Sequence, residues 1–119
     1  MSYIDAFVIP VPTARREDYR AHEAKWWPTF RGMGAQTLVV GWGDEVPPGK
    51  QTDFLRAVAA TPDETVVFAW MTWPDKATRD AAYKKMMEDP NMEGVEMPFD
   101  GKRMIYGGFE PILMEGEGA

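Results

Sequence analysis

The sequence predicts an α+β domain built on an antiparallel sheet, and three observations lead to this fold class. Four segments alternate apolar and polar residues or are rich in β-branched and aromatic ones, which is typical of strands. Two other segments repeat large apolar residues at helical spacing. The chain has 119 residues and no cysteine, so it is long enough for a core that needs no disulfide bonds. We therefore expect one domain over residues 1–119.

The first strand and the first helix are predicted from the N-terminal quarter of the chain. Aromatic and branched side chains alternate over residues 3–10, which predicts a strand. A helix is expected to begin at Thr13, because threonine caps helix N-termini. One face of this helix should be apolar, since large side chains recur at helical spacing: Tyr19, His22, Trp26 and Phe30. Pro28 is expected to kink or end the helix, and Gly32 completes the stop.

Two further strands are predicted in the middle of the chain. Residues 36–42 alternate as a strand does, and residues 65–73 give the strongest strand signal in the sequence. Between them lies an excursion with two prolines, in which residues 54–58 fit either a short edge strand or a helical turn. The residues leave that choice open.

The second helix and the last strand follow. Asp75 is expected to cap a helix that runs to about Glu88. Its inward stripe is predicted to be Arg79, Ala82, Tyr83, Met86 and Met87. An irregular connection is expected over residues 91–97, a strand over 102–113, and a frayed end over 115–119.

The predicted order of elements also predicts an assembly. The order strand, helix, strand, strand, helix, strand is the split βαβ pattern of a ferredoxin-like sandwich, with both helices on one face of the sheet. Residues 65–73 nevertheless place apolar side chains on both faces. We therefore expect a homodimer that packs sheet against sheet as a dimeric α+β barrel. The alternative is a monomer whose proline-containing excursion folds over the second face.

Four sequence blocks lie in the order found in one known family: residues 5–12, 43–50, 63–68 and 97–109. They resemble the YbaA-like family, a domain of unknown function (1428) in the dimeric α+β barrel superfamily. The resemblance covers nearly the whole chain and implies the fold and the homodimer predicted above. It implies no single activity, because the superfamily includes cofactor-free oxygenases, haem-degrading enzymes and many members without known activity. The chain departs from the family pattern at Leu55, where proline is usual, and at Trp42, where a smaller residue is expected.

Composition excludes several classes of partner. The net charge of −6 works against binding to the phosphate backbone of nucleic acid. No stretch approaches the roughly 20 apolar residues of a membrane-spanning helix, so no membrane is expected either. The lack of cysteine and of an N-terminal signal pattern favours a cytoplasmic location. Nine methionines and five tryptophans favour adaptable apolar surface around a cavity or an interface, or else a Met-rich core.

The turn and strand of residues 97–109 mix charged, aromatic and glycine positions more densely than any other segment, so we expect function there. Arg103 is a candidate for binding a carboxylate or enolate, with Asp100 or Asp5 as its partner in the empty protein. A purely structural Arg–Asp pair is the alternative. Tyr106 is a candidate hydrogen-bond donor or general acid, or else a core residue.

His22 completes the predicted catalytic set of His22, Arg103 and Tyr106. Its side chain is the only one whose ordinary pKa lies near neutrality, so it is a candidate general base or haem ligand. The alternative is a core or rim residue with one hydrogen bond. The ligand-binding candidates are Trp26, Phe30, Trp42, Trp70 and Asp100. The sequence has no HExxH or two-histidine pattern, so no metal site is expected.

The functional prediction is a small homodimer that binds a partly aromatic small molecule in the cleft between helix and sheet. Whether the protein is an enzyme stays open. One alternative is a monooxygenase-like enzyme, either cofactor-independent or haem-dependent, with His22 as base and Arg103 stabilising the anion. Another is a structural or regulatory dimer without a ligand. The cofactor stays unknown, and we expect that none is needed.

Overall fold

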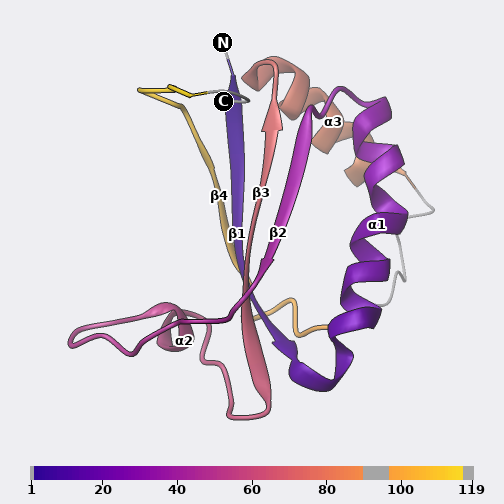
Figure 1. Ribbon diagram of the computed structural model, residues 1–119. Helices are drawn as coiled ribbons and strands as arrows, with labels where there is room; N and C mark the ends of the chain where they lie inside the picture. The colour runs from indigo at the N-terminus through magenta and orange to yellow at the C-terminus, as the bar shows by residue number, and fades with distance from the viewer. Residues whose placement is uncertain (1, 90–96, 117–119) are drawn as a thin grey trace.

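The fold is an α+β arrangement in which one antiparallel sheet carries two long helices on the same face (Figure 1). A computed structural model describes residues 2–89 and 97–116. Its elements are β1 (Tyr3–Pro12), the 3₁₀ turn η1 (Thr13–Arg15), α1 (Arg16–Gly32), β2 (Thr37–Trp42), α2 (Phe54–Ala57), β3 (Glu64–Trp73), α3 (Lys76–Glu88) and β4 (Ile105–Phe109). The strand order is β2-β3-β1-β4, with every neighbouring pair antiparallel. The predicted α+β class and antiparallel sheet are confirmed.

The core lies between the sheet and the two long helices. One cluster of buried residues consists of Ile9, Val11, Tyr19, Val67 and Ala69. A second consists of Ala35, Met71, Trp73 and Ala82. The odd-numbered residues of β1 and β3 therefore face the helices, because successive side chains of a strand point to opposite sides.

Among the described helices, only the short α2 lies on the other face of the sheet (Figure 1). This face carries apolar side chains from all four strands: Ile4, Val8, Val39, Phe68, Trp70, Ile105 and Phe109. We call these seven residues the open face. Phe68 is 41% exposed at its centre, although α2 lies on this side of the sheet (Figure 1) and Phe54 packs edge-on against Phe68 at 6.2 Å. The apolar second face that the sequence predicted is therefore present.

Pro28 does not end α1. The helix runs through Pro28 and stops at Gly32 as expected, shortly before Gly34, whose φ of +111° favours glycine. A proline removes one backbone donor from the helix. Trp27 and Phe30 pack against the second core cluster on either side of Pro28, and this packing holds the last turn.

The helix starts differ in how they are capped. Thr13 does not cap α1; it lies in η1, where its Oγ1 is 2.7 Å from Oγ1 of Thr65. Asp75 caps α3 as predicted, since its Oδ1 accepts a 2.7 Å hydrogen bond from the backbone N–H of Thr78. Residues 54–58, for which the sequence allowed either a strand or a helical turn, contain the helical turn α2. Asp53 caps it by accepting a hydrogen bond from the backbone N–H of Arg56.

The last strand is shorter than the predicted range 102–113. Asp100 holds the preceding turn, because its Oδ1 accepts from the amide of Lys102 at 3.0 Å and its carbonyl accepts from the amide of Arg103 at 3.3 Å. Pro111 has no amide to donate to a sheet beyond the strand's other end. β4 therefore covers only the residues between these two positions.

Three smaller points complete the fold. Met87 was wrongly placed on the inward stripe of α3, because its side chain is 90% exposed. Most of the connection expected over 91–97 and of the end expected over 115–119 lies outside the described residues. Within the described ranges, no helix combines the length and the apolar composition needed to cross a membrane.

Candidate functional site

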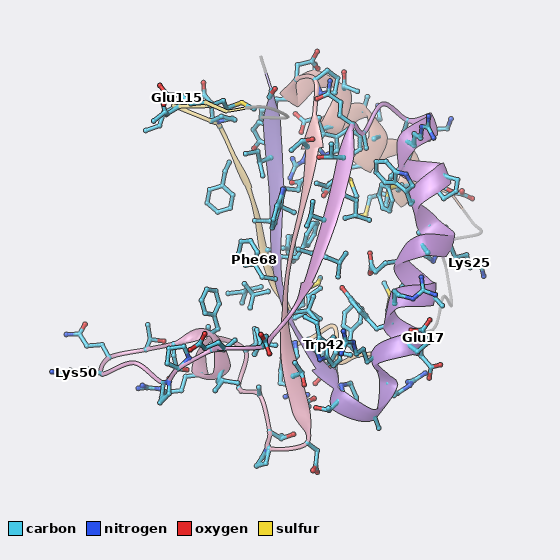
Figure 2. The ribbon with its side chains drawn as sticks, in the orientation of Figure 1. Glu17, Lys25, Trp42, Lys50, Phe68 and Glu115 are labelled. Atoms are coloured by element: carbon cyan, nitrogen blue, oxygen red, sulfur yellow. The ribbon has the colours of Figure 1, made fainter. Side chains whose placement is uncertain are left out.

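A cleft of about 600 Å³ lies between α1 and the edge strand β2. The helix contributes Arg16, Tyr19, Arg20, Glu23, Ala24 and Trp27, and the strand contributes Thr37, Leu38, Val40 and Trp42. The helical residues recur every three or four positions and so share one face of α1. Figure 2 shows Trp42 on the side of the sheet that faces α1. We call this space the α1–β2 cleft.

Tyr19 contributes a buried hydroxyl without a hydrogen-bond partner. The residue is only 1% exposed, and its ring packs edge-on against Phe99 at 5.7 Å. No hydrogen bond to its Oη is formed within the described residues. Burial raises the pKa of Tyr19 far above its ordinary value, and the charge of the nearby Glu23 carboxyl and a looser polar contact with that carboxyl add to the shift. A buried hydroxyl without a partner costs about 1–3 kcal/mol, so Tyr19 is suited to bind a polar atom of a ligand.

Glu23 lies one helical turn beyond Tyr19 and lines the same cleft. Burial raises the pKa of its carboxyl group, and the Tyr19 hydroxyl offsets part of that increase. In the described part of the chain no cation pairs with Glu23 within salt-bridge distance. A half-buried carboxyl of raised pKa can accept or donate a proton closer to neutral pH than an ordinary glutamate.

Arg16 and Trp42 meet at the end of the cleft nearest the start of α1. The Arg16 guanidinium lies 5.4 Å from the centre of the Trp42 ring, in cation–π contact. Arg20 is engaged elsewhere, because it pairs with Glu17 at 2.6 Å on the surface. Arg16 forms no ion pair with any residue of the described ranges, so its guanidinium edge is available to an anion.

Among the eight site residues predicted from the sequence, Trp42 is the one that lines the described cleft. His22 and Trp26 lie beside it on α1, with their rings 6.5 Å apart, and burial together with the charge of Lys25 lowers the pKa of His22. Phe30 packs against the second core cluster. Trp70 lies on the open face, 5.8 Å from the ring of Phe68.

Arg103 is held by protein carboxylates. Its guanidinium donates two hydrogen bonds to Glu64 at 2.7 and 2.6 Å and one to Asp100 at 2.8 Å. The bonds from Arg103 lower the pKa of Glu64 to about 2. Asp100 is thus a partner of Arg103, as predicted, whereas Asp5 is not, because Arg79 binds Asp5 instead.

Tyr106 lies on β4, at the opposite edge of the sheet from β2, and is 69% exposed. Neither Tyr106 nor Arg103 lines the α1–β2 cleft as the structure describes it. The catalytic roles of His22, Arg103 and Tyr106 stay predictions.

Sequence reasoning missed the polar residues of the cleft. It followed the helical stripe from Tyr19 through His22, whereas the residues that face β2 follow the stripe Tyr19, Glu23, Trp27 at a spacing of four. The sequence did contain a signal for this site: Glu23 lies four residues from an aromatic residue on each side, Tyr19 and Trp27. In the described residues, no three His, Asp or Glu side chains are grouped as a metal ion would need.

Comparison with known proteins places the chain in a family. A family model described as "Protein of unknown function (DUF1428)" matches residues 2–101. The "Uncharacterized protein YbaA" of Escherichia coli (strain K12) is 52% identical over 117 residues, which cover 97% of this chain and 100% of that protein. The protein of the same name from Shigella flexneri matches to the same extent. The chain therefore belongs to the YbaA-like family of proteins of unknown function, as the four sequence blocks indicated.

Proposed function

We propose that this protein is a homodimer that binds a small, partly aromatic molecule in the α1–β2 cleft. The Tyr19 hydroxyl carries the proposal, since it is a buried polar group at the cleft whose one polar neighbour known among the described residues, the Glu23 carboxyl, forms no well-aligned hydrogen bond with it. Trp27 and Trp42 supply aromatic walls on either side of it. A cleft of about 600 Å³ is also in the usual size range of small-molecule sites.

The homodimer is supported by the sheet. The strand order and the antiparallel pairings are those of a ferredoxin-like protomer, whose helices cover one face of the sheet. The open face is apolar in all four strands, and a second copy packed against it as a dimeric α+β barrel would remove that surface from water. A cytoplasmic location stays part of the proposal on the grounds given by the sequence.

The Tyr19→Phe variant tests the binding site. Phenylalanine keeps the ring and removes the unpartnered hydroxyl, so the free protein should be as stable as the wild type or about 1 kcal/mol more stable. Affinity for the ligand should instead fall about fivefold to tenfold, because one hydrogen bond is lost. Aromatic metabolites that raise the melting temperature would be found first by thermal-shift screening, and their affinities then measured by calorimetry.

The control is Thr52→Val, which removes an exposed hydroxyl in the loop between β2 and α2, outside the cleft lining, and should change neither quantity. If Tyr19→Phe lowers the stability of the free protein and leaves every affinity unchanged, the hydroxyl is structural and the proposal is wrong.

Turnover of the bound molecule is a second candidate function, favoured by Glu23. A carboxyl of raised pKa beside a tyrosine hydroxyl in an aromatic cleft is suited to general base catalysis on a phenolic or enolisable group. Oxygen consumption and absorbance would be followed with phenols and quinols in air. A rate that is lost in Glu23→Gln supports the enzyme, and an unchanged rate removes Glu23 from the mechanism.

A further inference from the structure

We infer that the ligand of the α1–β2 cleft is a planar aromatic carboxylate that carries a hydroxyl group at the other end of its ring. This inference rests on the proposed function and specifies the chemical class of the ligand. It follows from three groups that line the cleft: the guanidinium of Arg16, which forms no ion pair within the described ranges, and the buried hydroxyl of Tyr19 beside the carboxyl of Glu23.

Arg16 binds the carboxylate of the ligand. A guanidinium stacked on an aromatic face keeps its N–H edge free, and that edge matches the two oxygens of a carboxylate. The neighbouring cations are committed to protein carboxylates: Arg15 to Asp18 at 3.3 Å and Arg20 to Glu17 at 2.6 Å. Arg16 is therefore the arginine of this part of α1 that can offer its charge to a ligand.

Tyr19 and Glu23 bind the hydroxyl of the ligand. A hydroxyl group both accepts and donates a hydrogen bond. The Oη of Tyr19 can donate to the oxygen of that hydroxyl, and the carboxylate of Glu23 can accept its proton. A ligand hydroxyl thus gives the buried Tyr19 Oη the well-aligned partner that the described residues do not supply.

The order of these groups along α1 fixes the orientation and the size of the ligand. Arg16, Tyr19 and Glu23 are three and four residues apart, so they follow one another along a single face of the helix, one turn of about 5 Å at a time. The guanidinium of Arg16 lies at one end of this helix face and the carboxylate of Glu23 at the other. Glu23 would repel a carboxylate beside it, and so the acid group of the ligand must point toward Arg16. The ring between the two ends lies against Trp42.

Three matched probes test the inference: 4-hydroxybenzoate, benzoate without the hydroxyl, and 4-hydroxybenzamide without the charge. Affinities would be measured by calorimetry for the wild type and for Arg16→Gln. The control is Arg15→Gln, which removes the neighbouring arginine that pairs with Asp18 outside the cleft. All three proteins should fold alike, because both arginines are exposed.

The wild type should bind 4-hydroxybenzoate at least about tenfold more tightly than either other probe, because each lacks one group that pairs with a polar or charged partner. Arg16→Gln should weaken 4-hydroxybenzoate about tenfold and leave 4-hydroxybenzamide unchanged. Arg15→Gln should leave all affinities unchanged.

Three results would overturn the inference. Equal affinity for the acid and the amide, or an Arg16→Gln variant that binds the acid as the wild type does, would show that the cleft does not select a carboxylate. Absence of binding by all three probes would overturn it as well. The proposed function itself would be wrong only if a wider panel of neutral aromatic molecules also failed to bind the protein.

Discussion

Two buried polar residues between the sheet and the helices, Asp5 and Tyr19, differ in whether the protein supplies their hydrogen-bond partners. The carboxylate of Asp5, 2% exposed, accepts hydrogen bonds from the indole N–H of Trp73 at 2.9 Å and from the guanidinium of Arg79 at 2.9 to 3.2 Å. The guanidinium in turn lies over the rings of Tyr3 and Tyr83 at 5.3 and 4.3 Å. Every group of this network has its partners inside the protein, so the network is structural. The hydroxyl of Tyr19 has no well-aligned hydrogen-bond partner among the described residues, and the proposed ligand site is built on it.

Replacing Arg79 with leucine should therefore destabilise the protein strongly. Asp5 would stay buried without its cation, which costs about 3–5 kcal/mol for a broken buried pair. Urea unfolding of the variant measures the loss. Arg15→Leu is the matched control, since the exposed pair with Asp18 should contribute less than about 1 kcal/mol. A similar, small loss in both variants would contradict the structural role of the Asp5 network.

The pair of Glu64 and Arg103 should make stability depend on pH in the acid range. The pKa of Glu64 falls from its ordinary value of 4.5 to about 2 in the folded protein, chiefly through the hydrogen bonds from Arg103. The folded state gains from the ionised carboxylate, so this stability is complete above about pH 5 and is lost as pH falls toward 2. Over that range the unfolded chain binds up to about one proton more than the folded one.

Arg103→Gln should remove this part of the acid dependence. Urea unfolding free energies of wild type and variant would be compared at about pH 6 and about pH 3. The difference between the two proteins should be larger at the higher pH, where Glu64 is ionised in both states. A difference that is constant with pH would mean that the guanidinium does not hold Glu64 ionised.

What the sequence could predict about single residues was limited to partners close along the chain. Asp100 and Arg103 are three residues apart, and their pairing was foreseen. Glu64 and Arg103 are 39 residues apart, and only the meeting of β3 with the turn before β4 brings them together. The cleft could not be predicted for the same reason. The sequence indicates that Tyr19 lies on the apolar face of its helix, but it does not show that the described residues leave its hydroxyl without a well-aligned hydrogen-bond partner.

Among the helices and strands, the sequence correctly predicted the features that depend on residues close to one another along the chain. Asp75 caps α3 and the alternating segments form strands, because these preferences act within a few residues. Thr13 was misjudged as a cap, since it lies in η1 and its hydroxyl contacts that of Thr65. Of the two outcomes predicted for Pro28, α1 does not end there but runs on to Gly32, because core packing holds its last turn. Propensity is a weak guide wherever tertiary packing competes with it.

Asp75→Ala tests the strongest of these local signals. Loss of the 2.7 Å hydrogen bond to the Thr78 amide should lower the free energy of unfolding by about 1 kcal/mol. Thermal unfolding followed by circular dichroism measures this change. Asp44→Ala, an exposed aspartate outside every helix, should leave the melting temperature within error. Equal melting temperatures for the wild type and Asp75→Ala would show that the cap does not stabilise α3.

For the whole molecule, the open face is the basis of the proposed homodimer. Phe68 lies at its centre and, together with Phe54 and Trp70, forms an aromatic surface that a monomer would leave in water. The side of the sheet that bears Phe68 is opposite the side that faces α1 (Figure 2). Alternation in β3 predicted the apolar second face, and the homodimer is the proposal that follows from it, because a strand with apolar residues on both sides needs cover on both.

Phe68→Lys should convert the protein to a monomer. A lysine at the centre of the open face would place an unpaired charge in the dimer interface, which opposes association. Size-exclusion chromatography with light scattering should give a dimer for the wild type and a monomer for the variant. Met87→Lys is the control, since this exposed methionine lies on α3 and should leave the dimer intact. A monomeric wild type at every concentration would refute the homodimer.

The central claim is that a small aromatic molecule binds between α1 and β2, and the five tryptophans allow a direct test of it. Protein labelled with 5-fluorotryptophan would be titrated with aromatic ligands and followed by ¹⁹F NMR, each signal being assigned by Trp→Phe substitution. Trp27 and Trp42 line the cleft, whereas Trp70 lies on the open face and Trp73 in the core. The signals of Trp27 and Trp42 should shift on binding, while that of Trp70 should not. Shifts confined to Trp70, or no shift with any ligand, would contradict this claim.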